Sequence, residues 1–542
     1  MTVAQPSFEG LAGLGRRLAA EGRYADAGAI FQHLAAADPQ DLEAHRGLVA
    51  ALGGQGRTLE ALAYLQTMRA MQPDAESMLA DIRTLSEPAI VKYNAHLSAR
   101  EFEQAEPYAA ALAALAPMSG AMLGAALACN QALGRNPAIE RYARALLEVE
   151  PQSIVALAAL SALAPDPEAE IAAKMEAALA GAPGLHPLLQ LRDLHDVASL
   201  ILCRPLTPAS EIQVAQILAA AKALVVETDP GSEWEAWAKH YRLLLAAIDL
   251  EAIRAPTPAA SPEPELAYAD STGAPLDADG LRSAADRAGA EVVFFAAADE
   301  AYVDLYARWY VLSVLKYCDI PGLIVIHVIG GADRLVEIAA KIGVDDPRLV
   351  LVGDRFDAEA VTTAVHDAPP KGLIAKPVAH FQSVRFLRLG ALLEQLERPI
   401  FVSDIDLLLQ RGVRDLLDRA AVDDVMFNEN ESSWNAGSRL TANLLLVNPT
   451  ANAARFLAFL KSYLEGALEG AEVTRWIDQV SLILGRHHLV RHGQAPRIGY
   501  FDTSSDINNV MYPSYQAHPF RFLSLFHGFD TSSLEGDVRV AG

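Results

Sequence analysis

The sequence predicts a multidomain chain in which an all-α helical solenoid precedes an α/β domain with a mainly parallel sheet. Three observations lead to this prediction. At 542 residues the chain is too long for a single hydrophobic core. Its N-terminal part repeats small residues and prolines at a fixed interval, and its C-terminal part alternates apolar strand-like runs with helical ones.

The repeat interval in the N-terminal part is 34 residues, the distance from Pro39 to Pro73 and from Pro117 to Pro151. Other residue pairs keep the same step: Gly22 and Gly56, Ala27 and Ala61, Phe31 and Leu65. A glycine permits a tight turn between two helices, an alanine lets them approach closely, and a proline ends the second helix. Each unit is therefore expected to be a helical hairpin that stacks on the next one.

The segments EGRYADA at 21–27 and QGRTLEA at 55–61 resemble the tetratricopeptide repeat family. The resemblance implies about four repeats over residues 8–151, within a domain at 1–160, and Arg100 replaces the turn glycine of the third repeat. Residues 161–253 remain rich in alanine and leucine and are expected to extend or cap the array. Such arrays either bind a protein segment in a groove or serve as plain structural solenoids.

Residues 254–288 carry five prolines between Pro256 and Pro275 and are expected to form a linker. Strand-like runs then occur at 291–296, 323–329 and 349–352, with helical patterns at 304–317 and 334–342 between them. This alternation is typical of a parallel sheet flanked by helices, so residues 289–542 are expected to form the α/β domain.

Composition narrows the class of function. A formal net charge of −24 repels phosphate backbones and anionic lipid, which disfavours a nucleic-acid or membrane-surface role. The three cysteines are far apart and odd in number, which fits a reducing compartment. We find no secretory signal near the first residue and no apolar stretch long enough to span a membrane, so a cytoplasmic protein is expected.

The sharpest motif is PIFVSDIDLLLQ at 399–410, in which an apolar run ends in Asp404 and Asp406 with Ile405 between them. Ligands of open α/β sheets gather at the carboxyl ends of strands, and carboxylates suit a hard divalent cation such as Mn²⁺ or Mg²⁺. The preceding residues 381–397 form an amphipathic helical pattern with Arg385 and Arg388 on one face. These arginines either meet donor phosphate, or are solvated or paired with Glu394 and Asp404.

The order of helix, strand and D-x-D, preceded by the strand–helix unit that begins at residue 291, resembles GT-A glycosyltransferases, especially the glycogenin and lipopolysaccharide galactosyltransferase group. The resemblance covers about residues 289–530. It implies that the segment DEAY at 299–302 and a serine such as Ser313 belong to a nucleotide-binding unit. The nucleotide-sugar candidates are Ala297, Asp299, Tyr302, Arg385, Arg388, Ser403 and Ile405, and Asp404 and Asp406 are metal ligands.

Three later segments fit the same resemblance. TANLLLVN at 441–448 looks like the family's inner strand, with Asn443 in place of its usual glycine, and WIDQV at 476–480 supplies the Asp-Gln pair Asp478 and Gln479. Asn443, Asp478 and Gln479 are the catalytic candidates, with Asp478 preferred over Gln479. The family's third metal ligand, a C-terminal histidine, corresponds to His527 in FHGF at 526–529. His487, His488 and His492 are expected at the surface.

The predicted function is a metal-dependent glycosyltransferase that moves a sugar from a nucleotide-diphosphate donor, with UDP favoured by the family, to a protein acceptor. Repeat-bearing bacterial enzymes that modify flagellin or other surface proteins are the comparison for this architecture. A glycan or lipid-linked acceptor for surface polysaccharide is the substrate alternative. A haloacid dehalogenase-like phosphatase and a non-catalytic protein-binding scaffold are the alternatives of another class.

Overall fold

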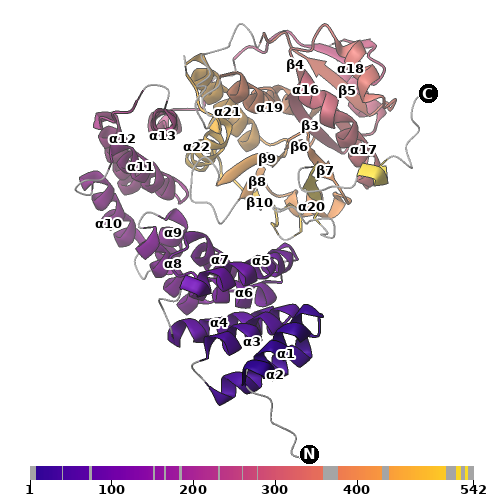
Figure 1. The fold of residues 1–542 in the computed structure, drawn as a ribbon. Coiled ribbons are helices and arrows are strands. Elements are labelled where there is room, and N and C mark those ends of the chain that lie inside the picture. The colour runs from indigo at the N-terminus through magenta and orange to yellow at the C-terminus, as the bar shows by residue number, and fades with distance from the viewer. Residues whose placement is uncertain are drawn as a thin grey trace, which may run out of the picture. The chain divides into compact units, whose positions relative to one another are not determined.

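A computed structural model of the chain describes residues 8–38, 41–71, 76–99, 101–150, 153–163, 167–181, 186–229, 232–258, 261–277, 279–357, 376–429, 439–470, 472–503, 505–507, 520–525 and 531–534. The chain forms two compact units, residues 1–167 and 168–542 (Figure 1). Among the described residues, no helix combines the length and the apolar character needed to cross a bilayer. Cys129, Cys203 and Cys318 form no disulfide.

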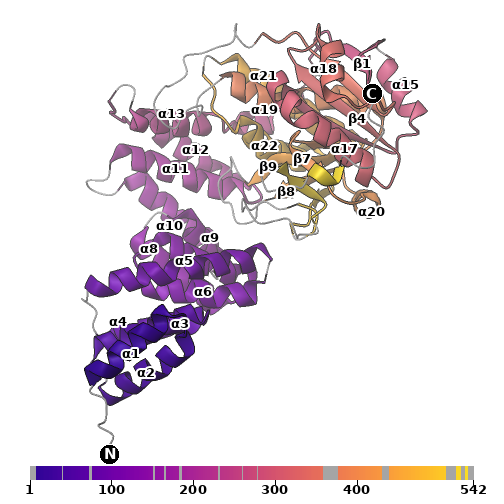
Figure 2. The same cartoon turned by 45° about the vertical axis from the view of Figure 1, so that its right-hand side comes forward.

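The first unit is a series of helical hairpins in which each helix packs against the next (Figures 1 and 2). Its helices are α1 (Phe8–Ala20), α2 (Tyr24–Ala37), α3 (Leu42–Gly54), α4 (Thr58–Met71), α5 (Glu76–Ser98), α6 (Phe102–Leu115), α7 (Gly120–Ala132), α8 (Asn136–Val149) and α9 (Ile154–Leu163). The hairpins α1–α2, α3–α4, α5–α6 and α7–α8 correspond to the four predicted repeats.

The repeat signature has the predicted physical basis. Gly22, Gly56 and Gly134 have φ angles of 75°, 74° and 63°, which L side chains rarely adopt. A Cβ atom at these three positions would meet nothing within 4 Å, so the backbone conformation and not crowding requires glycine. Ala27 and Ala61 are completely buried between their helices. Residue 100, the turn position of the third repeat, lies outside the described residues.

Five helices open the second unit: α10 (Pro167–Ala180), α11 (Pro187–Leu202), α12 (Pro208–Ala223), α13 (Glu233–Ala246) and α14 (Leu250–Arg254). Residues 161–253 were expected to extend or cap the helical array. Most of them instead belong to the same compact unit as the α/β part. For example, His487 contacts the carbonyl oxygen of Leu202 through Nε2 at 2.8 Å, and the Tyr463 hydroxyl donates to the carbonyl oxygen of Ala247.

The α/β part is built on a mixed sheet with the order β10-β8-β9-β6-β3-β4-β5-β1-β2. Its strands are β1 (Ala267–Asp270), β2 (Pro275–Leu276), β3 (Val292–Asp299), β4 (Gly322–Ile329), β5 (Leu349–Gly353), β6 (Ile400–Ser403), β8 (Val425–Glu429), β9 (Leu440–Val447) and β10 (Ile498–Tyr500). The central strands β6, β3, β4 and β5 are parallel, whereas β9 is antiparallel to both of its neighbours. A separate antiparallel pair joins β7 (Leu407–Leu409) to β11 (Phe522–Ser524).

Helices cover both faces of this sheet (Figure 1). They are α15 (Gly280–Arg287), α16 (Glu300–Tyr302), the π-helical turn η1 (Val303–Ala307), α17 (Arg308–Tyr317), α18 (Leu335–Ile342), α19 (Lys376–Leu396), α20 (Arg414–Ala420), α21 (Ala451–Glu469), α22 (Ile477–His492) and η3 (Thr531–Leu534). Alternate residues of β3, such as Phe294 and Ala296, pack in one core with α17 and α18. Helix α19 contacts β3 and packs against α21, which in turn packs against α22.

The expected linker at 254–288 contains regular structure. Strand β1 pairs antiparallel with β5, with Tyr268 opposite Val352, and β2 pairs with β1 at the edge of the sheet. Proline is tolerated at an edge strand because no ladder hydrogen bond is lost there, so the dense prolines hid a short strand pair.

The order of the strands fixes where a ligand fits. The chain runs from β3 to β4 and β5 in one direction and then returns to β6 on the other side of β3. The carboxyl ends of β3 and β6 therefore flank a topological switch point, which is where open α/β sheets bind their ligands.

Candidate functional site

Asp404 and Asp406 lie directly after β6, at the switch point, as predicted. The Asp404 amide donates to the carbonyl oxygen of Asn443 at 3.1 Å, and the Leu407 amide donates to the Asp404 carbonyl oxygen at 3.1 Å. These bonds close a turn in which Ile405 is buried in the core while the Asp404 side chain is 40% exposed. Two carboxylates thus come from one turn at the sheet edge, and Ile405 contributes apolar packing.

Arg385 of α19 contacts two acidic residues of the site, one in the turn after β6 and one in α22. Its Nη1 donates to Oδ1 of Asp404, and its Nη2 lies 3.5 Å from Oδ2 of Asp478, in the first turn of α22. Arg385 and Asp478 are both buried. Of the two roles left open for this arginine, the structure contains the pairing with Asp404, and it adds Asp478.

Asp478 has one carboxylate oxygen without a partner. Its Oδ1 is buried and accepts no hydrogen bond from the part of the chain that the structure describes. Burial raises the pKa of Asp478 to about 6, although Arg385 opposes the shift and the charge of Asp404 adds to it. A buried acceptor without a donor suits a ligand hydroxyl. Gln479, the next residue, is half-buried.

The turn before α22 is braced by α13. Thr474 Oγ1 lies 2.6 Å from Nδ1 of His240, and the His240 ring packs edge-on against Trp476 with centroids 5.4 Å apart. Trp476 has a left-handed backbone with φ 69°, an uncommon conformation for a bulky side chain. The packing of α13 therefore holds the strained residue that sets the start of α22, two residues before Asp478.

Asp406 is held from the C-terminal part of the chain. Ser524 Oγ donates to Asp406 Oδ2 at 2.6 Å, and the Leu525 amide donates to the Asp406 carbonyl oxygen at 2.9 Å. The pKa of Asp406 is raised to about 6, first because burial removes water and then because Asp404 is negatively charged.

The unit at the end of β3 has mixed roles. Oδ1 of Asp299 accepts a hydrogen bond from the Tyr302 amide at 2.9 Å and caps α16, so this carboxylate is engaged locally. Ala297 is buried in β3, whereas Tyr302 is 47% exposed and packs against the Tyr306 ring at 5.4 Å. Tyr306 belongs to the π-helical turn η1, a feature that often marks functional sites. Its pKa is raised by burial, and by Tyr302 and Asp406 to a smaller degree.

Three residues of the predicted nucleotide-binding set contact partners elsewhere in the α/β part. Ser403 Oγ lies 3.0 Å from the hydroxyl of Tyr310, which is buried in α17, and Ser313 accepts a bond from the Leu409 amide at 3.1 Å. These serines tie α17 to β6 and β7. Arg388 Nη1 pairs with Glu263 at 3.2 Å and its Nη2 lies 4.0 Å from Asp354, which in turn pairs with His327. Arg388 is thus paired, but its partners are Glu263 and Asp354 instead of the expected Glu394 and Asp404.

Asn443 bridges strands. Its Oδ1 accepts a hydrogen bond from Nδ2 of Asn428 at 2.7 Å, while its carbonyl oxygen receives the Asp404 amide. It therefore lies beside the D-x-D turn and links β9 to β8. Asn428, Tyr306, Ser524 and Glu263 were not predicted, since no sequence pattern connects them to the turn.

The donor set suits a divalent cation in part. Asp404 and Asp406 supply hard oxygen ligands, and a bound cation would offset the repulsion between their two negative charges. Within the described ranges no group of three histidine, cysteine, aspartate or glutamate side chains is arranged to hold a metal. His527, the predicted third ligand, lies outside the described residues.

His487, His488 and His492 were expected at the surface, but they do not all lie there. His487 is 6% exposed and His488 is completely buried. His488 lies 3.1 Å from the hydroxyl of Thr257, and His492 Nε2 lies 3.0 Å from the carbonyl oxygen of Ile253. Helix α14 and the residues after it cover this face of α22, which the polar pattern RHHLVRH alone does not reveal.

Comparisons with known proteins find matches to parts of the chain. A family model described as "Tetratricopeptide repeat" matches residues 18–83. A solved structure of the galactosyltransferase LgtC, in complex with donor and acceptor sugar analogs, is similar at 14% identity over 40% of this chain and 74% of that one, with a TM-score of 0.26. No curated protein matches the chain.

Two further solved structures are similar to parts of the chain. Mouse xyloside xylosyltransferase 1 matches at 11% identity over 40% of this chain and 86% of its own, with a TM-score of 0.25. A tetratricopeptide repeat protein from Parabacteroides merdae matches at 12% identity over 45% of this chain and 86% of its own, with a TM-score of 0.16. At such scores the fold is established by the sheet order above and not by these likenesses.

Proposed function

We propose that residues 289–542 form a glycosyltransferase that moves a sugar from a nucleotide-diphosphate donor to an acceptor hydroxyl. The observation that carries this proposal is the pair Asp404 and Asp406 at the switch point, linked through Arg385 to the buried Asp478. The bond between the sugar carbon and the diphosphate breaks, and the nucleoside diphosphate leaves with its electron pair. The acceptor oxygen bonds to that carbon, and the hydroxyl proton passes to the departing diphosphate.

Asp404 and Asp406 are the residues that would hold a Mn²⁺ or Mg²⁺ ion, with His527 as a proposed third ligand. When bound, such an ion neutralises negative charge on the diphosphate and stabilises it as a leaving group. Arg385 keeps the two neighbouring carboxylates of the site oriented, and its second partner Asp478 remains paired if Asp404 turns to another cation.

Asp478 is proposed to accept a hydrogen bond from a sugar or acceptor hydroxyl through its partnerless Oδ1. Tyr302, with its exposed ring, and Tyr306 are proposed to border the nucleotide. Asp299, Ala297 and Ser403 then act by shaping this edge, and Gln479 and Asn443 flank the sugar side.

A protein is the acceptor that the architecture favours. The first unit carries a tetratricopeptide repeat match, and this kind of array commonly binds peptide segments. We propose that the repeats hold the protein whose hydroxyl is modified, with UDP as the favoured nucleotide and flagellin or another surface protein as the acceptor. The alternative is a glycan or lipid-linked acceptor, and a screen of acceptors would distinguish it from a protein acceptor.

The test is hydrolysis of a panel of nucleotide sugars by the full chain, with and without Mn²⁺. The double variant Asp404→Asn, Asp406→Asn removes both charges with little change in shape, and Asp418→Asn on the exposed face of α20 is the matched control. We expect metal-dependent turnover of one donor that the control keeps and the double variant loses. Absence of turnover and of donor binding for every nucleotide sugar would refute the proposal and favour a protein-binding scaffold.

A further inference from the structure

The C-terminal strand β11 reaches the D-x-D turn from a distant part of the sequence. It pairs antiparallel with β7, the strand that follows Asp406, with Ser524 opposite Leu407. This register brings the Ser524 hydroxyl to Asp406 Oδ2 and the Leu525 amide to the Asp406 carbonyl oxygen. Asp406 is therefore fixed at both its side chain and its backbone by residues more than a hundred positions later in the chain.

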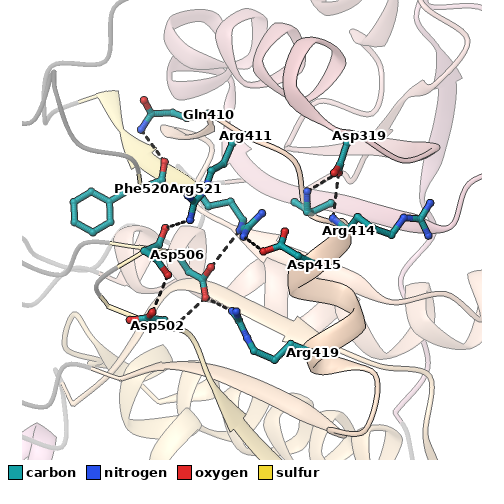
Figure 3. Close-up of polar contacts among 12 residues, drawn as sticks. Asp319, Gln410, Arg411, Arg414, Asp415, Arg419, Asp502, Asp506, Phe520 and Arg521 are labelled. Carbon is teal, nitrogen blue, oxygen red and sulfur yellow. Dashed lines mark hydrogen bonds and ion pairs between the residues drawn. The ribbon is translucent and has the colours of Figure 1, made fainter.

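A cluster of charged residues holds the beginning of this strand (Figure 3). Arg521 pairs through Nε with Asp506 Oδ1 at 3.2 Å and through Nη2 with Asp415 Oδ2 at 2.7 Å. Arg419 pairs with the other oxygen of Asp506. The side chains of Arg521 and Asp506 are 3% and 0% exposed, so this is an ion pair removed from water. We call Asp415, Arg419, Asp506 and Arg521 the anchor cluster.

Backbone hydrogen bonds complete the anchor cluster's hold. The Arg521 amide donates to the Ser505 carbonyl oxygen at 3.0 Å, and the Phe522 amide donates to the Asp506 carbonyl oxygen at 2.8 Å. On the other side, the Gln410 side chain donates to the Phe520 carbonyl oxygen at 3.2 Å (Figure 3). Residues 520–522 are thus fixed between the end of β7 and residues 505–506.

A buried ion pair contributes little net stability, because desolvation offsets most of the attraction between the charges. Its best-attested use is to fix register, and register matters here. A slip of β11 by one residue would turn Ser524 to the opposite face, since side chains alternate along a strand. The anchor cluster penalises that slip because it would leave Arg521 and Asp506 buried without partners.

We propose that Ser524 is a positioning residue for Asp406, and that the Arg521–Asp506 pair sets the strand register that brings Ser524 there. The role of Ser524 rests on the proposed function, in which Asp406 holds a divalent cation. Partners that orient a metal-ligating carboxylate typically change metal affinity by about 10- to 100-fold when removed. The register role of Arg521 does not depend on any ligand.

The first arm of the test measures amide hydrogen exchange of residues 520–525 in the full chain. Arg521→Gln is expected to raise exchange at Phe522 and Leu525 by about tenfold or more, because their amides donate to the carbonyl oxygens of Asp506 and Asp406 only in the native register. Arg414→Gln is the control, since it removes an exposed arginine paired with Glu291 nearby. Unchanged exchange in Arg521→Gln would overturn the register role.

The second arm measures Mn²⁺ binding to the full chain by calorimetry, without donor. Ser524→Ala is expected to weaken binding by about 10- to 100-fold, while Ser524→Thr keeps a hydroxyl and restores it. Ser505→Ala is the control, because its hydroxyl donates to Asp502 at 2.8 Å and not to Asp406. Equal affinity of Ser524→Ala and the parent protein would overturn the positioning role.

The two arms separate the proposals. If the parent protein binds no Mn²⁺ and hydrolyses no donor, the proposed function fails and the positioning role toward a cation fails with it. The exchange result then still decides whether Arg521 sets the register. If the parent protein binds Mn²⁺ and Ser524→Ala binds it equally well, only the further inference is lost.

Discussion

Arg385 is the residue on which the charge balance of the site depends. It is the basic partner of Asp478, and both side chains are at least nine-tenths buried. Removal of one member of a buried ion pair leaves the other charge without compensation, whereas replacement of both members can be neutral. Arg385 therefore orients the carboxylates of the site and also contributes to the stability of the folded protein.

Arg385→Met is expected to lower the free energy of unfolding by about 3–5 kcal/mol at pH 8, measured by urea denaturation. At pH 5 the loss should be smaller, because Asp478, whose pKa is already raised to about 6, then takes up a proton and no longer needs a cation. The double variant Arg385→Met, Asp478→Leu should recover most of the loss. Arg414→Met, which breaks an exposed pair, should cost less than about 1 kcal/mol. Equal losses in Arg385→Met and Arg414→Met would contradict this reasoning.

Asp478→Asn tests the role of the free carboxylate oxygen in donor turnover. We expect kcat for donor turnover to fall by about 10²- to 10⁴-fold, the usual contribution of a positioned acid or base, with a smaller change in the donor KM. Gln479→Leu, at the half-buried neighbour, should reduce kcat less. Steady-state kinetics of the two variants side by side decide whether the preference for Asp478 is correct.

At the scale of elements, α22 is held by neutral histidines. Burial lowers the pKa of His487 to about 4, so the folded protein takes up this proton only well below the pH at which an unfolded chain does. The depressed folded pKa means that stability is present above about pH 6.5 and is lost as the pH falls toward 4. Helix α22 therefore gives the second unit a source of acid sensitivity.

The free energy of unfolding is expected to fall between pH 6.5 and pH 4, and His487→Gln should make this fall less steep. The slope should change by at most the contribution of one proton, about 1.4 kcal/mol per pH unit. Denaturant titrations at several pH values measure this slope. His33→Gln, at an exposed position of α2, is the control. A slope that His487→Gln does not change would show that other groups cause the acid sensitivity.

At the scale of the whole molecule, the chain has two compact units, and the boundary between them in the sequence lies at residues 167 and 168. Each has its own hydrophobic clusters, and the candidate site lies within the second unit alone. Donor chemistry and acceptor capture are accordingly separable in the proposed enzyme.

Deletion of residues 1–167 is expected to leave donor hydrolysis within about twofold, because no site residue is removed, while transfer to a protein acceptor falls to background. Parallel assays with the protein acceptor and with a simple sugar acceptor measure both. Loss of transfer to the sugar acceptor as well would indicate that the first unit contributes to catalysis and not to recruitment.

Local signals in the sequence were sufficient for part of this structure. The spacing of Gly22 and Gly56 predicted the repeat turns because a left-handed turn requires glycine there. The D-x-D turn was predictable because an apolar run ends in Asp404. The pair of Arg388 with Glu263 was not, since it joins residues 125 positions apart. Strand β1 was hidden by neighbouring prolines, and the burial of His488 depends on covering elements that its own helix does not reveal.

The pairing of β11 with β7 sets an order of assembly during translation. Apart from Leu525, every other described residue of the candidate site precedes Ser524 in the chain, so a nascent chain on the ribosome can form β3, β6 and α22 while Asp406 still lacks its fixing hydrogen bonds. The site is completed only after residue 525 has been synthesised. A ribosome that terminates shortly before this point would release a chain that contains every strand of the nine-stranded sheet but lacks the two hydrogen bonds that fix Asp406.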